Sequence, residues 1–176
     1  MNNDYNNANA NENENGMSQN KKDKITDIII LAVIAVFFFA VLIINGVPMY
    51  NDSDQYISMH VRREPVYPVF LYIIRVLFKD HRLIVTGLIQ TVITVLASYS
   101  FVKYFAVRFR LNAVCKCAVC GFVLMPYILT PLFSTMHVTM SCAVMSESIA
   151  IPLFLIFFVY IHRGISDNSV YALAAA

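Results

Sequence analysis

The sequence has no tryptophan, only five glycines and few charged residues, which make up 14% of its 176 residues. An average soluble domain has about 25% charged residues, so this shortage disfavours the ordinary soluble classes. Thirteen Lys and Arg against eleven Asp and Glu leave a net charge of only +2. A nucleic-acid-binding protein would be expected to have a strongly basic face, so no nucleic-acid partner is predicted.

Cysteines are also few, and their spacing gives no complete site. Cys115, Cys117 and Cys120 follow a C-x-C-x-x-C pattern, but no fourth ligand for tetrahedral zinc lies near them. Cys142 is remote from this cluster, so no disulfide framework is indicated and helix packing is the favoured interpretation. The sequence contains no G-x-G-x-x-G, Walker A or G-x-S-x-G motif, so soluble nucleotide-dependent chemistry is not indicated.

Hydrophobic residues, at 59% of the chain, are concentrated after a polar N-terminal tail. Nine of the first 20 residues are Asn. Such a low-complexity segment cannot bury enough apolar surface to offset its ordering entropy. We therefore expect residues 1–24 to form a disordered cytoplasmic tail and residues 25–176 to form a transmembrane helical domain.

Residues 28–44 form seventeen uninterrupted apolar residues, preceded by three lysines. A helix over 25–48 would be about 36 Å long, enough to cross a hydrocarbon core of about 30 Å. A signal peptide has a similar pattern, but its apolar region is only about 7–15 residues long and ends in a small-x-small cleavage site. The sequence therefore predicts a retained first span.

Three further spans are predicted, over residues 83–107, 113–133 and 143–161. The apolar segment 66–79 is only about 21 Å long as a helix and contains Arg75, so an interfacial helix is favoured over a span. The predicted fold is all-α, a polytopic transmembrane helix bundle. It has about four spans, with a juxtamembrane helix in the first outer loop.

The distribution of Lys and Arg predicts the orientation of this bundle. With the N-terminus in the cytoplasm, eight of these residues lie inside and five lie outside. This bias favours a multi-pass protein with a cytoplasmic N-terminus. The plasma membrane is the expected location, because the sequence has no organelle signal. The five outer residues also suggest an anionic ligand; they are Arg62, Arg63, Arg75, Lys79 and Arg82.

Acidic residues gather on the same predicted outer face. Asp52 and Asp54 follow the first span, and Glu147 lies at the start of the fourth. Carboxylates suit Mg²⁺ or Mn²⁺ and can act as general bases, while arginines suit a phosphate. His137 lies on an outer segment and could also contact phosphate. The alternative is that Asp52 to Asp54 form only a polar turn.

The stretch from Asp52 to Tyr56, followed by Arg63 to Pro68 and an apolar helix, resembles the first outer loop of the GT-C glycosyltransferases. These multispan enzymes take sugars from polyprenyl-phosphate carriers. The similarity extends over residues 25–163 and includes a Ser-Glu pair at the outer start of a later helix, here Ser146 and Glu147.

The resemblance implies a catalytic role for three acids. Asp52 matches the loop acid that acts as base on the acceptor or helps to hold the metal, and Asp54 is a helper. Glu147 matches a second acidic position. It could instead be an interfacial residue whose charge interacts favourably with a helix N-terminus. If a Mg²⁺ or Mn²⁺ ion is used, Asp52 and Glu147 are its implied ligands.

The resemblance also implies a set of residues that bind the substrate. Arg63 would meet the carrier phosphate beside Arg62, while Tyr56 and Tyr67 would shape the loop and the helix after it. His137 is added to this set because it lies on an outer segment and not because of the resemblance, although a lone histidine is more often incidental. The implied partners are the lipid bilayer and a polyprenyl-phosphate-linked sugar, and the implied reaction inverts the anomeric carbon.

Enzymes of this superfamily usually have seven or more spans, so the chain is expected to be the N-terminal part of one and to be inactive alone. An alternative is a small non-catalytic integral membrane protein, such as an assembly or transport subunit. A transporter fragment is a third possibility, although only Glu147 comes near the expected midplane position of an ionisable residue.

Overall fold

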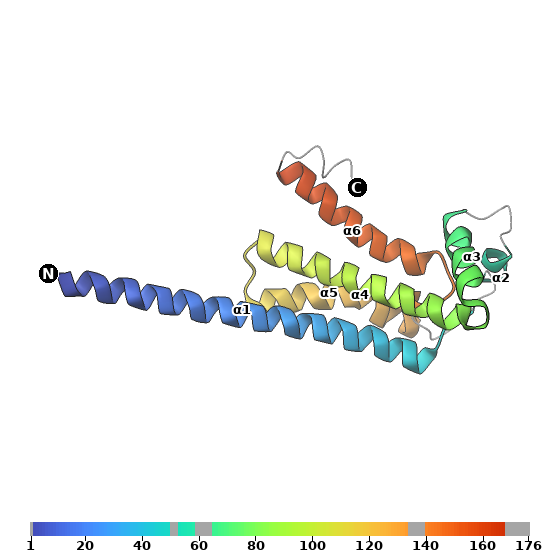
Figure 1. The fold of residues 1–176 in the computed structure, drawn as a ribbon, viewed down its shortest axis with the longest axis horizontal. Helices are drawn as coiled ribbons and strands as arrows, with labels where there is room; N and C mark the ends of the chain where they lie inside the picture. Colours follow the sequence, from blue (N-terminus) through green and yellow to red (C-terminus); the bar gives the residue numbers. More distant parts are fainter. Residues whose placement is uncertain (1, 50–52, 59–64, 134–139, 168–176) are drawn as a thin grey trace.

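The computed structural model describes residues 2–49, 53–58, 65–133 and 140–167. Every regular element in these ranges is a helix, which confirms the expected all-helical class (Figure 1). The elements are α1 (Asn2–Asn45), α2 (Ser53–Ile57), α3 (Val66–Phe78), the 3-10 turn η1 (Lys79–His81), α4 (Arg82–Arg108), α5 (Ala113–Phe133), the 3-10 turn η2 (Met140–Cys142) and α6 (Glu147–Ser166).

Helix α1 is longer than the sequence predicts. It begins at Asn2, and its first part extends beyond the other helices (Figure 1). The sequence predicts disorder for this polar segment, whereas the structure continues the helix through residues 2–24. Once the apolar residues have formed a helix, each further residue adds a hydrogen bond without a new nucleation cost. At the other end, Gly46 has φ of 63° and its N–H donates to the Leu42 carbonyl at 2.9 Å, which terminates α1.

Helix α4 is central to the bundle, because it contacts α1, α3, α5 and α6. Many of its buried side chains are hydroxyl or amide groups; they are Thr86, Gln90, Thr91, Thr94 and Ser98. The Thr86 and Thr94 hydroxyls donate to carbonyls one turn earlier, at 2.7 and 2.8 Å. The small hydroxyl side chains let helices approach closely, and polar side chains such as that of Gln90 are also typical of helix contacts inside membranes.

The first apolar core lies between α1, α4 and α5. In it, the fully buried Phe38 of α1 meets Tyr127 of α5 edge to face, with ring centroids 4.8 Å apart. Aromatic pairs at this spacing add attraction beyond the area that they bury. A second, smaller core lies at one end of the bundle and consists of Tyr56, Tyr67, Leu71 and Val144.

A sharp turn separates the short helix α3 from α4. Lys79 adopts a φ of 41°, which few residues other than glycine adopt, and its N–H donates to the Arg75 carbonyl. Figure 1 shows α3 lying across the end of the bundle rather than along it. The predicted juxtamembrane helix over 66–79 thus appears as a separate helix that ends one residue earlier, at Phe78.

Three helical stretches are long and apolar enough to cross a membrane: Lys22–Asn45, Val66–Arg108 and Glu147–Ser166. The second of them contains the turn at Lys79. The predicted span over about 143–161 corresponds to α6, which begins at Glu147 and continues to Ser166. The predicted span 113–133 corresponds to α5, whose bounds are Ala113 and Phe133 and whose described side chains over Ala113–Leu129 form an apolar helix.

Candidate functional site

The second core brings α2, α3 and the start of α6 together at one end of the bundle (Figure 1). The rings of Tyr56 and Tyr67 meet edge to face, with centroids 5.2 Å apart. Both side chains are buried, as is Val144, which precedes α6. Side chains from segments far apart in the sequence therefore pack together in one small core at this end.

Hydrogen bonds to backbone groups also hold these segments together. The Ser53 hydroxyl of α2 donates to the Val144 carbonyl at 2.9 Å, and the Val144 N–H donates to the Pro48 carbonyl at 3.1 Å. Residue 144 is therefore bonded on both sides to the chain that follows α1. Because these bonds replace helical ones, they also explain why α6 starts later than the sequence predicts.

A short series of hydrogen bonds leads from the loop helix α2 to the acidic start of α6. The Ser146 hydroxyl donates to Glu147 Oε2 at 3.2 Å and lies 3.1 Å from the Tyr56 hydroxyl. A serine hydroxyl has one proton, so Tyr56 is the donor to Ser146. Two predicted site residues, Tyr56 and Glu147, thus belong to one hydrogen-bonded group.

Glu147 itself is exposed and occupies the first turn of α6. The unpaired N–H groups of a helix start favour a negative charge there. The carboxylate therefore lies at the surface of the bundle end, where a polar ligand can reach it. This geometry suits either of the roles predicted for Glu147, the catalytic and the interfacial one.

Tyr67 faces inward and bonds within the protein. Gln90 Nε2 of α4 donates to its hydroxyl at 2.7 Å, and both side chains are buried. Asp54, by contrast, is exposed in the first turn of α2. Of the predicted site residues, the structure therefore brings Tyr56, Tyr67 and Glu147 into one cluster, with Asp54 on the same short helix as Tyr56.

The other predicted site residues, Asp52, Arg62, Arg63 and His137, lie outside the described residues. Within the described ranges, no three His, Cys, Asp or Glu side chains are grouped as metal ligands. The Mg²⁺ or Mn²⁺ site, which was predicted on Asp52 and Glu147, therefore stays a prediction.

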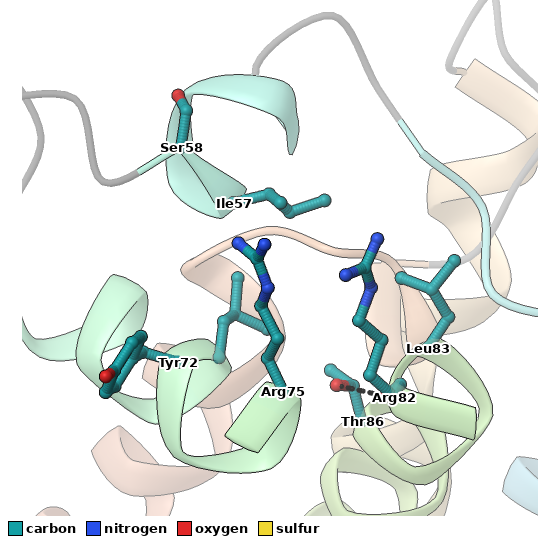
Figure 2. Close-up of a pocket in the computed structure, with 8 residues that line it drawn as sticks. Ile57, Ser58, Tyr72, Arg75, Arg82, Leu83 and Thr86 are labelled. Carbon is teal, nitrogen blue, oxygen red and sulfur yellow. Dashed lines mark hydrogen bonds between the residues drawn. The ribbon is translucent and has the colours of Figure 1, made fainter. Parts of the chain in front are cut away.

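A basic pocket of about 200 Å³ lies beside this cluster, between α2, α3 and α4. Figure 2 shows the guanidinium groups of Arg75 and Arg82 side by side, both reaching toward Ile57 and Ser58 of α2. The sequence places both arginines outside, but it does not reveal that they face one pocket. That pairing depends on the turn at Lys79, for which the only local signal is the short Lys-Asp-His break between two apolar segments.

A second charged cluster lies near the α4–α5 connection. Lys116 of α5 is buried, and its Nζ lies 3.2 Å from Asp27 and 3.6 Å from Asp23, both on α1. The sequence predicts only that this lysine lies on the inner side. Its burial and pairing show that it fastens α5 to α1, since an unpaired buried ammonium would be costly.

No protein-family model, no curated protein and no solved structure matches this chain. Its helices define its class as an all-helical protein with three helical stretches that are long and apolar enough to cross a membrane. What it does must therefore be inferred from its own side chains.

Proposed function

We propose that the chain is the membrane-embedded part of a GT-C-like glycosyltransferase that moves a sugar from a polyprenyl-phosphate carrier to an acceptor. The observation that carries the proposal is the hydrogen-bonded series from Tyr56 through Ser146 to Glu147. The resemblance assigns Tyr56 and the Ser146–Glu147 pair to one site although they are 90 positions apart in the chain. Their contact supports that assignment.

The architecture around the series gives further support. A short loop helix and an interfacial helix follow the first apolar helix and lie against the start of a later one. With the N-terminus in the cytoplasm, this end of the bundle faces outward at the plasma membrane. A lipid-linked donor in the outer leaflet and an acceptor outside the cell would both reach it.

In the proposed reaction, Asp52 removes the proton from an acceptor hydroxyl. The acceptor oxygen forms a bond to the anomeric carbon on the face opposite the phosphate. The bond between that carbon and the phosphate oxygen breaks, and its electron pair leaves with the polyprenyl phosphate. Glu147 and Asp54 would orient the acceptor, and Arg62, Arg63 and His137 would stabilise the leaving phosphate. No step is derived through a metal ion.

The test is sugar transfer from a radiolabelled polyprenyl-phosphate sugar, measured in native membranes from cells that express variants from the gene itself. We expect Asp52→Asn to lower the rate by about 10²-fold or more, the usual contribution of a general base. Glu147→Gln should also lower it. The control is Asp167→Asn, which removes an exposed carboxylate beyond the far end of α6.

Equal rates in all three variants and the unmodified protein would contradict the proposal. They would favour the alternative, a non-catalytic assembly or transport subunit, in which the outer acids tolerate replacement. A loss of activity in Asp167→Asn as large as that in Glu147→Gln would also count against it, because the effect would then not belong to the bundle end that contains Tyr56.

A further inference from the structure

The pocket between α2, α3 and α4 contains two arginines that none of the described acidic side chains pairs with. Within the described residues, neither Arg75 nor Arg82 forms an ion pair with an acidic side chain, although both line the same pocket (Figure 2). Two like charges that face one space repel each other, and the repulsion is relieved when an anion binds between them.

The charges next to this pocket reinforce that field. An adjoining pocket of about 370 Å³ shares Arg75 and Arg82 and adds Lys79 and Asp80. The two pockets together are therefore lined by three cationic side chains and one acidic side chain. Apart from the Tyr72 phenol, no other described titratable side chain lines either space.

The position of Arg82 is unfavourable for the helix that carries it. Arg82 is the first residue of α4, where the partial positive charge of the helix favours acidic residues instead. A cation at that position destabilises a helix unless an anion lies beside it. A ligand that brings negative charge would be stabilised by the arginine and by the helix end together.

The size and walls of the pocket restrict the ligand. Pockets for drug-sized molecules measure about 300–1,000 Å³, so the 200 Å³ here suits a single small group. Guanidinium forks match phosphate oxygens with paired hydrogen bonds. Apolar side chains complete the pocket, with Ile57, Leu71 and Leu83 on its walls, and the outward face of α3 exposes Ile73 and Leu77.

We propose that Arg75 and Arg82 bind one phosphate group, carried either by a phospholipid headgroup or by a soluble phosphate. The apolar face of α3 would place the pocket at headgroup depth, where a lipid phosphate enters beside its own acyl chains. The inference does not depend on sugar transfer, since it rests on the pocket and its charges alone.

The test is calorimetric titration of the full-length protein in detergent micelles. The titrants are short-chain phosphatidic acid, short-chain diacylglycerol and inorganic phosphate. For phosphatidic acid, we expect Arg75→Gln and Arg82→Gln each to weaken binding by about tenfold, the effect of losing one charge-assisted hydrogen bond. Arg75→Lys and Arg82→Lys should retain part of the affinity. The control is Arg163→Gln, an exposed arginine near the far end of α6 that should change binding little.

The titrants distinguish the two sources of the phosphate. Tighter binding of phosphatidic acid than of inorganic phosphate identifies a lipid headgroup, while equal binding of the two identifies a soluble phosphate. The proposal is overturned if both glutamine variants bind phosphatidic acid as the unmodified protein does. It is also overturned if diacylglycerol, which has no phosphate, binds as tightly as phosphatidic acid. Sugar transfer is not measured here, so failure of this test leaves the glycosyltransferase proposal standing.

Discussion

The hydroxyl of Tyr67 connects the candidate site to the centre of the bundle. It accepts a hydrogen bond from Gln90 Nε2, whose side chain is fully buried in α4. The other end of that amide, Oε1, has no hydrogen-bond partner among the described residues. Gln90 therefore depends on Tyr67 for one of its buried polar atoms, and the interfacial helix α3 is held against α4 through this contact.

We predict that Tyr67→Phe will destabilise the protein by about 1–3 kcal/mol, because it leaves the buried amide nitrogen of Gln90 without an acceptor. The thermal unfolding midpoint in mild detergent, followed by circular dichroism, measures the change. Tyr72→Phe is the matched control on the same helix, since Tyr72 is 54% exposed. Equal midpoints for the two variants would show that the Tyr67–Gln90 hydrogen bond contributes nothing to stability.

Sequence reasoning at this scale identifies some residue types but not their contacts. Tyr56 and Glu147 are predicted from a resemblance between short motifs, and the structure adds Ser146 as the hydroxyl between them. The pairing of Arg75 with Arg82 and the burial of Lys116 are not predicted. Both depend on chain segments that meet only after the helices have packed, and no local pattern records such contacts.

Gly87 of α4 lies where this helix packs against the end of α1 and against Val47, which follows it. A methyl group added to Gly87 of α4 would lie 2.5 Å from Val47 Cγ2 and 3.1 Å from Leu42 Cδ1. Val47 is β-branched and stiff, so it cannot easily move aside. Gly87 is therefore required for the close packing of α4 against the end of α1 and the residues that follow it.

We predict that Gly87→Ala will destabilise the bundle by about 1–3 kcal/mol through overpacking. Gly121→Ala is the matched control, because a methyl group added there, on α5, meets no atom within 4 Å. That substitution should be neutral or stabilise by up to about 1 kcal/mol, since alanine favours the helix. The thermal unfolding midpoint in detergent should thus fall for Gly87→Ala and stay unchanged or rise for Gly121→Ala. An equal fall in both variants would refute the packing argument.

The helix boundaries were predictable from the sequence where local composition alone determines them. The apolar run of α1 and the limits of α4 follow from local composition, and so does the separate short helix α3. The start of α6 was not predictable, because Val144, just before it, bonds to Pro48 and Ser53 in the chain after α1. These contacts join positions about 90 residues apart, and hydrophobic periodicity carries no information about them.

For the molecule as a whole, the contacts at the two ends of the bundle constrain how often the chain crosses a membrane. Ser146, just before α6, touches Tyr56 of α2 at one end, whereas Lys116 at the start of α5 pairs with Asp27 near the other. The chain must therefore travel the length of the bundle between residues 116 and 146. With 21 residues, α5 is about 31 Å long, close to the thickness of a hydrocarbon core. The proposed topology of four crossings therefore counts α5 together with the three longer apolar stretches.

This topology predicts which thiols react from each side of the membrane. Ser58→Cys, on the exposed end of α2, should be labelled by an impermeant maleimide in intact cells. The exposed Cys115 and Cys117 should react only after permeabilisation. Cys142 should stay unlabelled, because burial raises the pKa of its thiol and blocks access.

Thiol labelling at the end of α6 tests whether α5 crosses the membrane. Four crossings with a cytoplasmic N-terminus place Ser166 inside. The Ser166→Cys variant, made with Cys115 and Cys117 replaced by serine, should therefore react only in permeabilised cells. If α5 did not cross, α6 would run in the opposite direction and the same thiol would react in intact cells, on the side of Ser58→Cys. Ser146 would then lie across the membrane from Tyr56, and their 3.1 Å contact could not form.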